Sequence, residues 1–253
     1  MNNQINVAFI GNPNCGKTTL FNDYTGAKLK VANWPGVTVE KKEGMFKFHE
    51  HRFKLVDLPG IYSLSSYSME EIVSRQYILE SDVDVIVDVI DASSLERNLY
   101  LAIQLIELGK PVVLGLNMMD IVEARGMEID LHRLQEMLGV PAIPISARKR
   151  KGLDILMHAV AHHAHEGAGH EFEHHHTNQS RHRHNHHKEF AMVYSDEIED
   201  KIDIISDRLR DRYKDIINVR WHAIKILEKD SEILSRYPIE VEDVGADLAS
   251  ARI

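Results

Sequence analysis

The sequence predicts an α/β domain, built on a mostly parallel six-stranded sheet with helices on both faces, followed by a small all-α domain. Strand-sized apolar runs alternate with segments of helical periodicity over roughly the first 160 residues. Beyond residue 189, apolar residues recur at helical spacing, and a polar stretch separates the two parts. We therefore expect a first domain at 1–160, a mobile linker or insertion at 161–188 and a helical domain at 189–253.

The expected elements of the first domain follow from apolar periodicity. Residues 44–57 alternate apolar and polar side chains around a polar centre, which predicts two antiparallel strands. The runs typical of buried strands are 5–10, 82–91, 111–117 and 140–146. The segments with helical periodicity are 18–26, 95–109 and 128–139.

Composition and charge limit the classes of partner. Apolar residues make up 43% of the 253 residues, which is enough for a sizeable core. Thirty basic residues against 39 acidic ones give a formal net charge of −9, so we expect no nucleic-acid partner. The basic run at 148–151 is short and is typical of a solvated loop before a helix.

The single cysteine, Cys15, allows no internal disulfide and suits a reducing cytoplasm. The first residues lack the basic start and apolar centre of a signal peptide. The longest apolar stretches are strand-sized and broken by aspartates, so we expect this fragment to be soluble. Such a fragment is compatible with being the soluble part of a membrane protein.

Residues 11–18 read GNPNCGKT, a G-x-x-x-x-G-K-T loop between a predicted strand and a predicted helix. The glycines allow backbone N–H groups to wrap phosphates, Lys17 can bridge terminal phosphate oxygens, and the Thr18 hydroxyl can ligate Mg²⁺. The residues expected to contact the nucleotide here are Asn14, Cys15, Gly16, Lys17, Thr18 and Thr19.

Three further residues follow in the order that a nucleotide switch requires. Thr38 lies about twenty residues past the loop, where it would reach Mg²⁺ and the γ-phosphate, and Asp57 ends a later strand, where it can hold a metal-bound water. Gly60 then offers its N–H to the γ-phosphate. We expect Mg²⁺ to be held by Thr18, Thr38 and, through water, Asp57. The catalytic candidates are Lys17, Thr38, Gly60 and Asn14.

The segment NMMD at 117–120 predicts guanine as the base. The carboxylate of Asp120 can accept hydrogen bonds from the guanine N1–H and N2–H₂ groups, whereas adenine presents an acceptor there. Asn117 can brace the base and the neighbouring loop, and Ser146-Ala147 can present a backbone N–H to the guanine oxygen. Met118 stands where such motifs carry lysine, which predicts looser nucleotide binding and quick release of GDP.

The segment DLPGIY at 57–62 has an apolar residue, Ile61, after its glycine. In Ras-type switches a glutamine at this position orients the attacking water. Ile61 cannot do so by hydrogen bonding, which predicts slow intrinsic hydrolysis and help from elsewhere.

Twelve of the sixteen histidines lie between residues 158 and 187. Neutral imidazoles suit Fe²⁺, Zn²⁺ or Ni²⁺, so this tract could gather or sense metal. The competing interpretation is a disordered linker that binds metals adventitiously, and the sequence favours it because no predicted helix or strand fixes the histidines in space.

The segments GNPNCGKTTLFN, VANWPGVTVE, DLPGIYSLS, NMMD and SA together resemble the cytoplasmic G domain of the ferrous iron transport protein B family, a family of bacterial membrane transporters. The similarity is tight over about residues 3–160 and looser beyond them. The helical segment near residues 189–236 is similar to the regulatory, guanine-dissociation-inhibitor-like domain of that family.

This resemblance implies a Ras-like, Mg²⁺-dependent P-loop GTPase that K⁺ activates, on the cytoplasmic side of the inner membrane. It implies K⁺ ligation by Asn14 with backbone carbonyls near Ala32 and Trp34. It also implies coupling of GTP hydrolysis to Fe²⁺ uptake through a membrane domain of the same transporter that lies outside this chain. Small accessory iron-transport proteins and a homo-oligomer are further partners that it suggests.

A second function remains open on the sequence: a stand-alone, K⁺-dependent GTPase of ribosome assembly or tRNA modification, which shares the G-x-P-N-x-G-K-T loop. The net charge of −9 disfavours RNA, and the segment WPGVTVE favours the transporter. A protein that only binds metal would leave the nucleotide motifs without a role.

Overall fold

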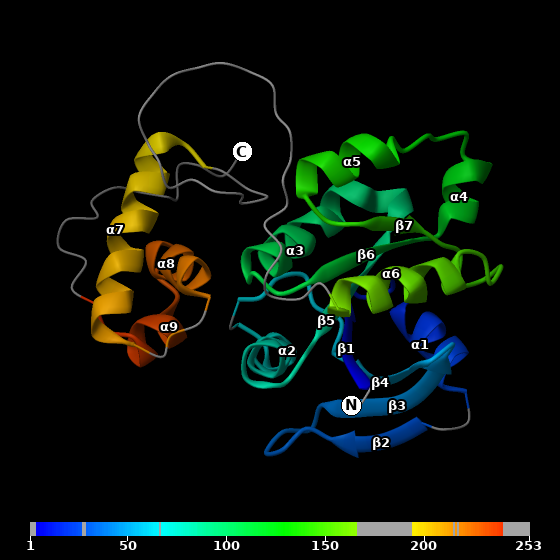
Figure 1. The fold of residues 1–253 in the computed structure, drawn as a ribbon, viewed down its shortest axis with the longest axis horizontal. Helices are drawn as coiled ribbons and strands as arrows, with labels where there is room; N and C mark the ends of the chain where they lie inside the picture. The colour runs from blue at the N-terminus through cyan, green and yellow to red at the C-terminus, as the bar shows by residue number, and fades with distance from the viewer. Residues whose placement is uncertain are drawn as a thin grey trace.

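The computed structural model describes residues 4–26, 29–65, 67–165, 194–214, 216 and 218–239. An α/β domain comes first and a helical unit follows it (Figure 1). The strands are β1 (Gln4–Gly11), β2 (Leu29–Asn33), β3 (Glu40–Phe48), β4 (His51–Asp57), β5 (Val85–Asp91), β6 (Val112–Asn117) and β7 (Ala142–Pro144). The helices of the first domain are α1 (Lys17–Thr25), α2 (Met69–Glu80), α3 (Leu95–Glu107) after the 3₁₀ turn η1 (Ala92–Ser94), α4 (Met119–Ala124), α5 (Leu131–Leu138) and α6 (Leu153–His165). The helical unit contains α7 (Asp196–Arg212), α8 (Val219–Leu227) and α9 (Ser231–Arg236).

The domain boundaries predicted from the sequence need one adjustment. Helix α6 continues to His165, so the first residues of the stretch predicted as a mobile linker are helical. The remainder of that linker, 166–188, lies outside the described residues, as does 240–253 of the predicted helical domain. None of the helices within the described ranges is long and apolar enough to cross a membrane.

The sheet has seven strands in the order β2-β3-β4-β1-β5-β6-β7, so the prediction of six was wrong. Strands β4, β1, β5, β6 and β7 run parallel, and β3 and β2 add antiparallel pairs at one edge. The missed strand is β2, whose residues after Leu29 are all exposed. An exposed edge strand has no apolar face to bury, and its sequence therefore lacks the alternation that reveals a strand.

Two layers of helices cover the sheet, as the strand–helix alternation predicts. Side chains of α1 and α6, such as Phe21 and Met157, pack with Phe9 on one face. Side chains of α2 and α3, such as Ile78 and Leu101, pack on the opposite face. Because β1, β4, β5 and β6 run parallel, their carboxyl ends meet at one edge of the sheet, where ligands bind in open α/β folds.

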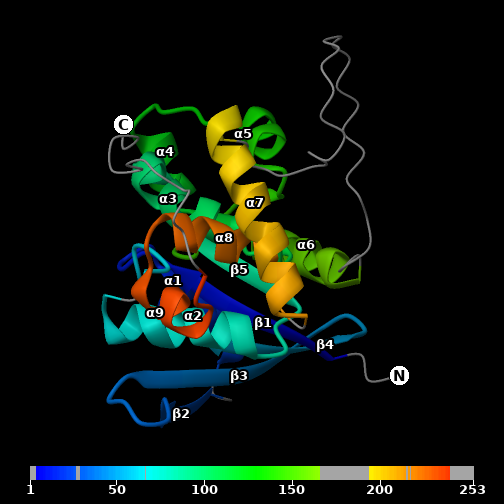
Figure 2. The same cartoon turned by 90° about the vertical axis from the view of Figure 1, so that its left-hand side faces the viewer.

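The helices α2 and α3 lie between the sheet and the helical unit (Figures 1 and 2). Trp221 and Ile205 are fully buried and belong to the same hydrophobic cluster as the α2–α3 face. The described parts of the helical unit are thus joined to the first domain by a shared apolar core.

Candidate functional site: a nucleotide pocket at the sheet edge

The loop between β1 and α1 is shaped by two glycines that have no room for a side chain. A Cβ on Gly11 would lie 2.3 Å from the Val89 carbonyl oxygen, and one on Gly16 would lie 2.3 Å from Asn117 Nδ2. Gly16 also has a φ of 87°, which side-chain-bearing residues rarely adopt. The loop can therefore approach both β5 and the end of β6 closely.

Lys17 opens α1 with its side chain buried at the carboxyl end of β4. Its ammonium group forms an ion pair with the Asp57 carboxylate and donates a hydrogen bond of 2.6 Å to the Leu58 carbonyl. Both charged side chains are more than nine-tenths buried. The structure thus brings together the lysine of the loop and Asp57, which the sequence predicts to hold Mg²⁺ through water.

The DLPGIY segment is fastened to the loop by backbone hydrogen bonds. The Leu58 N–H donates to the Phe9 carbonyl at 2.9 Å, and the Ile61 N–H donates to the Gly11 carbonyl at 3.1 Å. Gly60 lies against Pro13, since a Cβ at Gly60 would be 3.2 Å from the Pro13 Cα. The Ile61 side chain is only 2% exposed and belongs to the core, so it does not face the site as a water-orienting residue would.

Asn117, at the end of β6, ties two loops together. Its Nδ2 donates to the Cys15 carbonyl at 2.9 Å, and its Oδ1 accepts from the Ala147 N–H at 2.9 Å. Every hydrogen-bonding partner of this amide is backbone, so its position fixes the phosphate loop relative to the 146–147 loop. Met118 follows in the left-handed conformation, with a φ of 65°, and starts α4.

Asp120 is held by Ser146, whose hydroxyl donates to its Oδ1 at 2.8 Å. The Ser146 hydroxyl in turn accepts from the Lys149 N–H at 3.2 Å. The pKa of Asp120 is lowered, chiefly by the Ser146 hydrogen bond; desolvation opposes this shift, while a backbone hydrogen bond and the nearby charges of Lys149 and Arg148 add to it. A carboxylate oriented and kept ionised in this way is a hydrogen-bond acceptor for a base edge rich in donors.

The single cysteine contributes its backbone rather than its thiol. Cys15 is 1% exposed, and burial raises the pKa of its thiol to about 12. The thiol is therefore protonated and packs as an apolar side chain in the core. The backbone carbonyl of Cys15 accepts the hydrogen bond from Asn117.

Among the described residues, no hydrogen bond or ion pair joins Ala32, Trp34 or Thr38 to this pocket, although Trp34 shares a hydrophobic cluster with Ile61. Thr38 is exposed in the turn between β2 and β3, and Ala32 lies in the β2–β3 ladder opposite Lys41. Trp34 is buried against Tyr77 of α2, with ring centroids 5.2 Å apart. The remaining candidates, Asn14, Thr18 and Thr19, are exposed at the loop and the first turn of α1.

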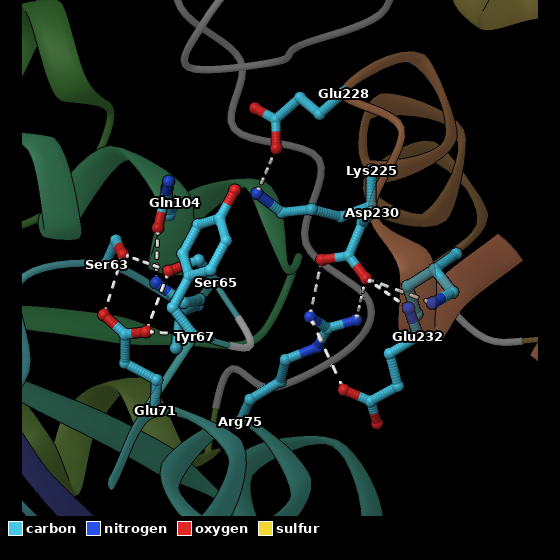
Figure 3. A network of polar contacts seen from close by, with 12 residues as sticks. Ser63, Ser65, Tyr67, Glu71, Arg75, Gln104, Lys225, Glu228, Asp230 and Glu232 are labelled. Carbon is cyan, nitrogen blue, oxygen red and sulfur yellow. Dashed lines mark hydrogen bonds and ion pairs between the residues drawn. The ribbon is translucent and has the colours of Figure 1, made fainter. Parts of the chain in front are cut away.

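Sequence periodicity missed the helix that follows the DLPGIY segment, although a signal was available. Ser68 and Glu71 form a capping box at the start of α2, a serine followed three residues later by glutamate. Glu71 also accepts hydrogen bonds from the Ser63 and Ser65 hydroxyls at 3.1 and 2.9 Å (Figure 3). The loop that follows the DLPGIY segment (the sensing turn) is thereby held against the first turn of α2.

The same helix carries the main polar contact with the helical unit. Arg75 is 1% exposed, and its guanidinium donates to both oxygens of Asp230 at 2.7 and 3.3 Å (Figure 3). It also lies over the Trp221 ring, 5.0 Å from the centroid. Asp230 additionally caps α9 by accepting from the Glu232 and Ile233 N–H groups. An exposed pair, Arg236 with Glu80 at 3.0 Å, joins the same two parts of the chain.

Taken together, the doubly covered parallel sheet, the phosphate loop, the sensing turn and the Asn117–Asp120 base site define a P-loop guanine-nucleotide-binding domain. The family model for ferrous iron transport protein B matches residues 5–160, and the model for the FeoB cytosolic helical domain matches residues 194–252. The chain therefore belongs to the ferrous iron transport protein B family, as the sequence motifs predicted, and the ribosome-assembly alternative is not favoured.

Individual relatives agree with this assignment. The chain is 53% identical over 157 residues to the Fe(2+) transporter FeoB of Legionella pneumophila strain Paris, covering 60% of this chain. It is 48% identical over 164 residues to the Fe(2+) transporter FeoB of Salmonella typhimurium, covering 63% of this chain. In both cases the match spans 21% of the relative, so the chain corresponds to about a fifth of these transporters.

Solved structures are similar over both parts of the chain. One is an S. thermophilus NFeoB mutant bound to mGDP, with a TM-score of 0.80 and 38% identity, covering 94% of this chain and 84% of that one. Another is the cytosolic domain of L. pneumophila FeoB, with a TM-score of 0.77 and 38% identity, covering 91% and 84%. A third is the cytosolic domain of the T. maritima FeoB iron transporter in a GDP form, with a TM-score of 0.78 and 34% identity, covering 94% and 86%.

Proposed function

We propose that this chain binds GTP and GDP and hydrolyses GTP slowly, as the cytoplasmic GTPase unit of a bacterial Fe²⁺ transporter. The observation that supports the proposal is the Asn117 bridge beside Asp120, because a carboxylate held next to a phosphate loop suits the donor-rich edge of guanine. The coupling to Fe²⁺ uptake and to a membrane domain is inferred from relatives named Fe(2+) transporter FeoB. Accessory iron-transport proteins and a homo-oligomer remain proposals on the same basis.

The residues around Asp57 suit Mg²⁺, a hard cation that takes oxygen ligands. Asp57 contacts Lys17, and Thr18 follows Lys17 directly, so the chain brings a carboxylate and a hydroxyl to the start of α1. We propose that Thr18 and, through water, Asp57 hold the ion, with Thr38 joining them when the β2–β3 turn moves toward the loop. The ion would neutralise charge on the phosphates.

For K⁺ the described arrangement offers fewer ligands. The Trp34 carbonyl already accepts the Val37 N–H at 3.3 Å, and Ala32 lies in the β2–β3 ladder. Asn14, in the phosphate loop, is exposed and has a φ of 67°. The proposed site with Ala32 and Trp34 therefore requires a rearranged turn between β2 and β3.

The slow hydrolysis is proposed from what the chain places around the γ-phosphate. Lys17 can counter the phosphate charge, and the Gly60 N–H can donate to it from beside Pro13. Ile61 is packed into the core and supplies no hydrogen bond to water from its side chain. The reaction then depends on positioning and electrostatic stabilisation, without a side chain that orients the attacking water at the usual glutamine position.

We further propose that the helical unit regulates the nucleotide site by restraining α2. The Arg75–Asp230 pair attaches it to the helix that directly follows the sensing turn. A restraint on α2 limits the motion of the DLPGIY segment and should slow the release of GDP.

Exchange of one residue tests the base assignment. In Asp120→Asn the acceptor pair becomes one acceptor and one donor, so affinity should shift from GDP toward XDP, whose O2 is an acceptor. Competition against a fluorescent GDP analogue measures GDP, XDP and ATP affinities, and the wild type should bind GDP but not ATP. Glu123→Gln, on the exposed face of the same helix, is the matched control. Comparable ATP and GDP affinities in the wild type would refute guanine specificity.

Comparing the rate of GTP hydrolysis in K⁺ with the rate in Na⁺ tests the proposal that K⁺ activates the reaction. We expect faster GTP hydrolysis in K⁺ for the wild type, and no difference between the two salts for Asn14→Ala. Equal rates under all four conditions would remove K⁺ from the proposal while leaving guanine specificity intact.

A further inference from the structure

Two histidines from distant parts of the chain meet on the surface of the first domain, away from the nucleotide pocket. His49 occupies the two-residue turn between β3 and β4, and His158 lies on α6. Their ring centroids are 5.0 Å apart with an interplanar angle of 37°. Both side chains are exposed, so a solute can reach them.

This separation of the ring centroids is compatible with a shared metal ion. Ring nitrogens at about 2.1 Å from an ion, subtending an angle of about 90–110°, set imidazole centroids about 5 Å apart. Flat stacking, by contrast, would require nearly parallel rings.

The pair is also held in place before any ion binds. The Phe48 ring contacts both imidazoles edge-on, with centroid distances of 4.3 Å to His49 and 4.8 Å to His158. Phe48 itself stacks on Phe46 at 6.0 Å, which continues into the core on this face. Preorganised ligands lose less conformational freedom when they bind.

The backbone of the turn contributes to the same placement. His49 has a φ of 51°, in the left-handed region that residues other than glycine rarely occupy. A two-residue hairpin turn requires a positive φ, so this conformation fixes the course of the turn and with it the position of His49.

We propose that His49 and His158 form a surface site for a divalent first-row transition-metal ion, of the class that prefers imidazole nitrogen, with water completing its coordination. Among the described residues, no three histidine, cysteine or carboxylate side chains are grouped to hold a metal, so the site has two protein ligands. A bound ion links the β3–β4 turn to α6.

The test measures protection of individual histidines from carbethoxylation by mass spectrometry, in the full chain with and without Zn²⁺. With Zn²⁺ in excess over all sixteen histidines, we expect modification of both His49 and His158 to slow by about tenfold or more, and the same excess of Mg²⁺ to give no protection. His132, exposed on α5, is the reference position and should be modified at an unchanged rate.

Two variants assign the ligands. His49→Asn keeps a residue that tolerates the left-handed turn and should abolish protection of His158. His158→Ala sits on an exposed helix position and should abolish protection of His49. His132→Ala should change neither.

Three results would overturn the proposal. The first is modification of His49 at the same rate with and without Zn²⁺. The second is protection of His158 that survives in His49→Asn, which would place the ion on α6 and other histidines. The third is equal protection by Mg²⁺.

Discussion

The contact between α2 and the helical unit allows a quantitative prediction for Arg75→Met. Breaking a buried ion pair from one side costs about 3–5 kcal/mol, because the remaining charge stays buried. Asp230 retains two backbone N–H donors in the variant, so we expect the lower end, about 3 kcal/mol of unfolding free energy. The methionine preserves the apolar stem over Trp221 and confines the change to the charge.

The assay is urea unfolding followed by tryptophan fluorescence, to which Trp34 of the first domain and Trp221, fully buried in the helical unit beside Arg75, both contribute. Arg236→Met is the matched control, because Arg236 and Glu80 join the same two parts of the chain while both side chains are more than half exposed. Its cost should be about 0–1 kcal/mol. Asp230→Asn keeps the cap of α9, and the double variant measures the coupling between the two side chains.

The same pair predicts a pH dependence. Burial alone would raise the pKa of Asp230, but hydrogen bonds from Arg75 and the Ile233 N–H, with the Arg75 charge, bring it below its usual value. The stability that Asp230 contributes is therefore present above its unfolded pKa and is lost as pH falls through the lower, folded pKa. The acid-induced loss should be smaller in Arg75→Met. Equal unfolding free energies for Arg75→Met and Arg236→Met would refute the reasoning, and an unchanged GDP release rate in Arg75→Met would refute the regulatory proposal.

Three further predictions concern the nucleotide pocket. Ile61→Gln should lower stability by about 2–4 kcal/mol, because it buries an amide without partners, and it should not raise GTP turnover in a phosphate-release assay; faster turnover would contradict the structural reason for slow hydrolysis. The Cys15 thiol should resist a thiol reagent at pH 8 until the chain unfolds, and its raised pKa should make stability fall as pH rises above about 8.5, the ordinary thiol pKa; rapid labelling of folded protein would contradict this. Gly16→Ala should abolish binding of fluorescent GDP while the protein remains folded by circular dichroism, because the added methyl displaces Asn117; wild-type affinity would show that the close approach is unimportant.

Much of the first domain could be predicted from periodicity because most of its strands and helices have a regular pattern of buried apolar residues. The parallel strands β1, β5, β6 and β7 and the helices α1, α3 and α5 lie where the apolar runs predicted them, within a few residues. The antiparallel pair around His49 was predicted as well. Strand β2 was missed because it is exposed at the edge, and α2 was missed because its apolar residues are interrupted by buried Ser74 and Arg75.

For the candidate site, too, the sequence predicted some features and the structure alone revealed others. Chain order and residue type were enough to select Lys17, Asp57, Asn117 and Asp120, because phosphate and guanine recognition demand particular groups at the ends of particular strands. Their mutual contacts could not be read from the chain, since they join residues far apart in sequence.

The sequence by itself determined the class of fold and the family, and it predicted a guanine nucleotide, because these depend on local motifs and on their order. Only the tertiary structure decided that Ile61 is a core residue, that Arg75 reaches Asp230, and that His49 meets His158. Each of these depends on which surfaces the sheet and its helices bring together. That packing is a property of the whole chain, and no short segment of it encodes the contact.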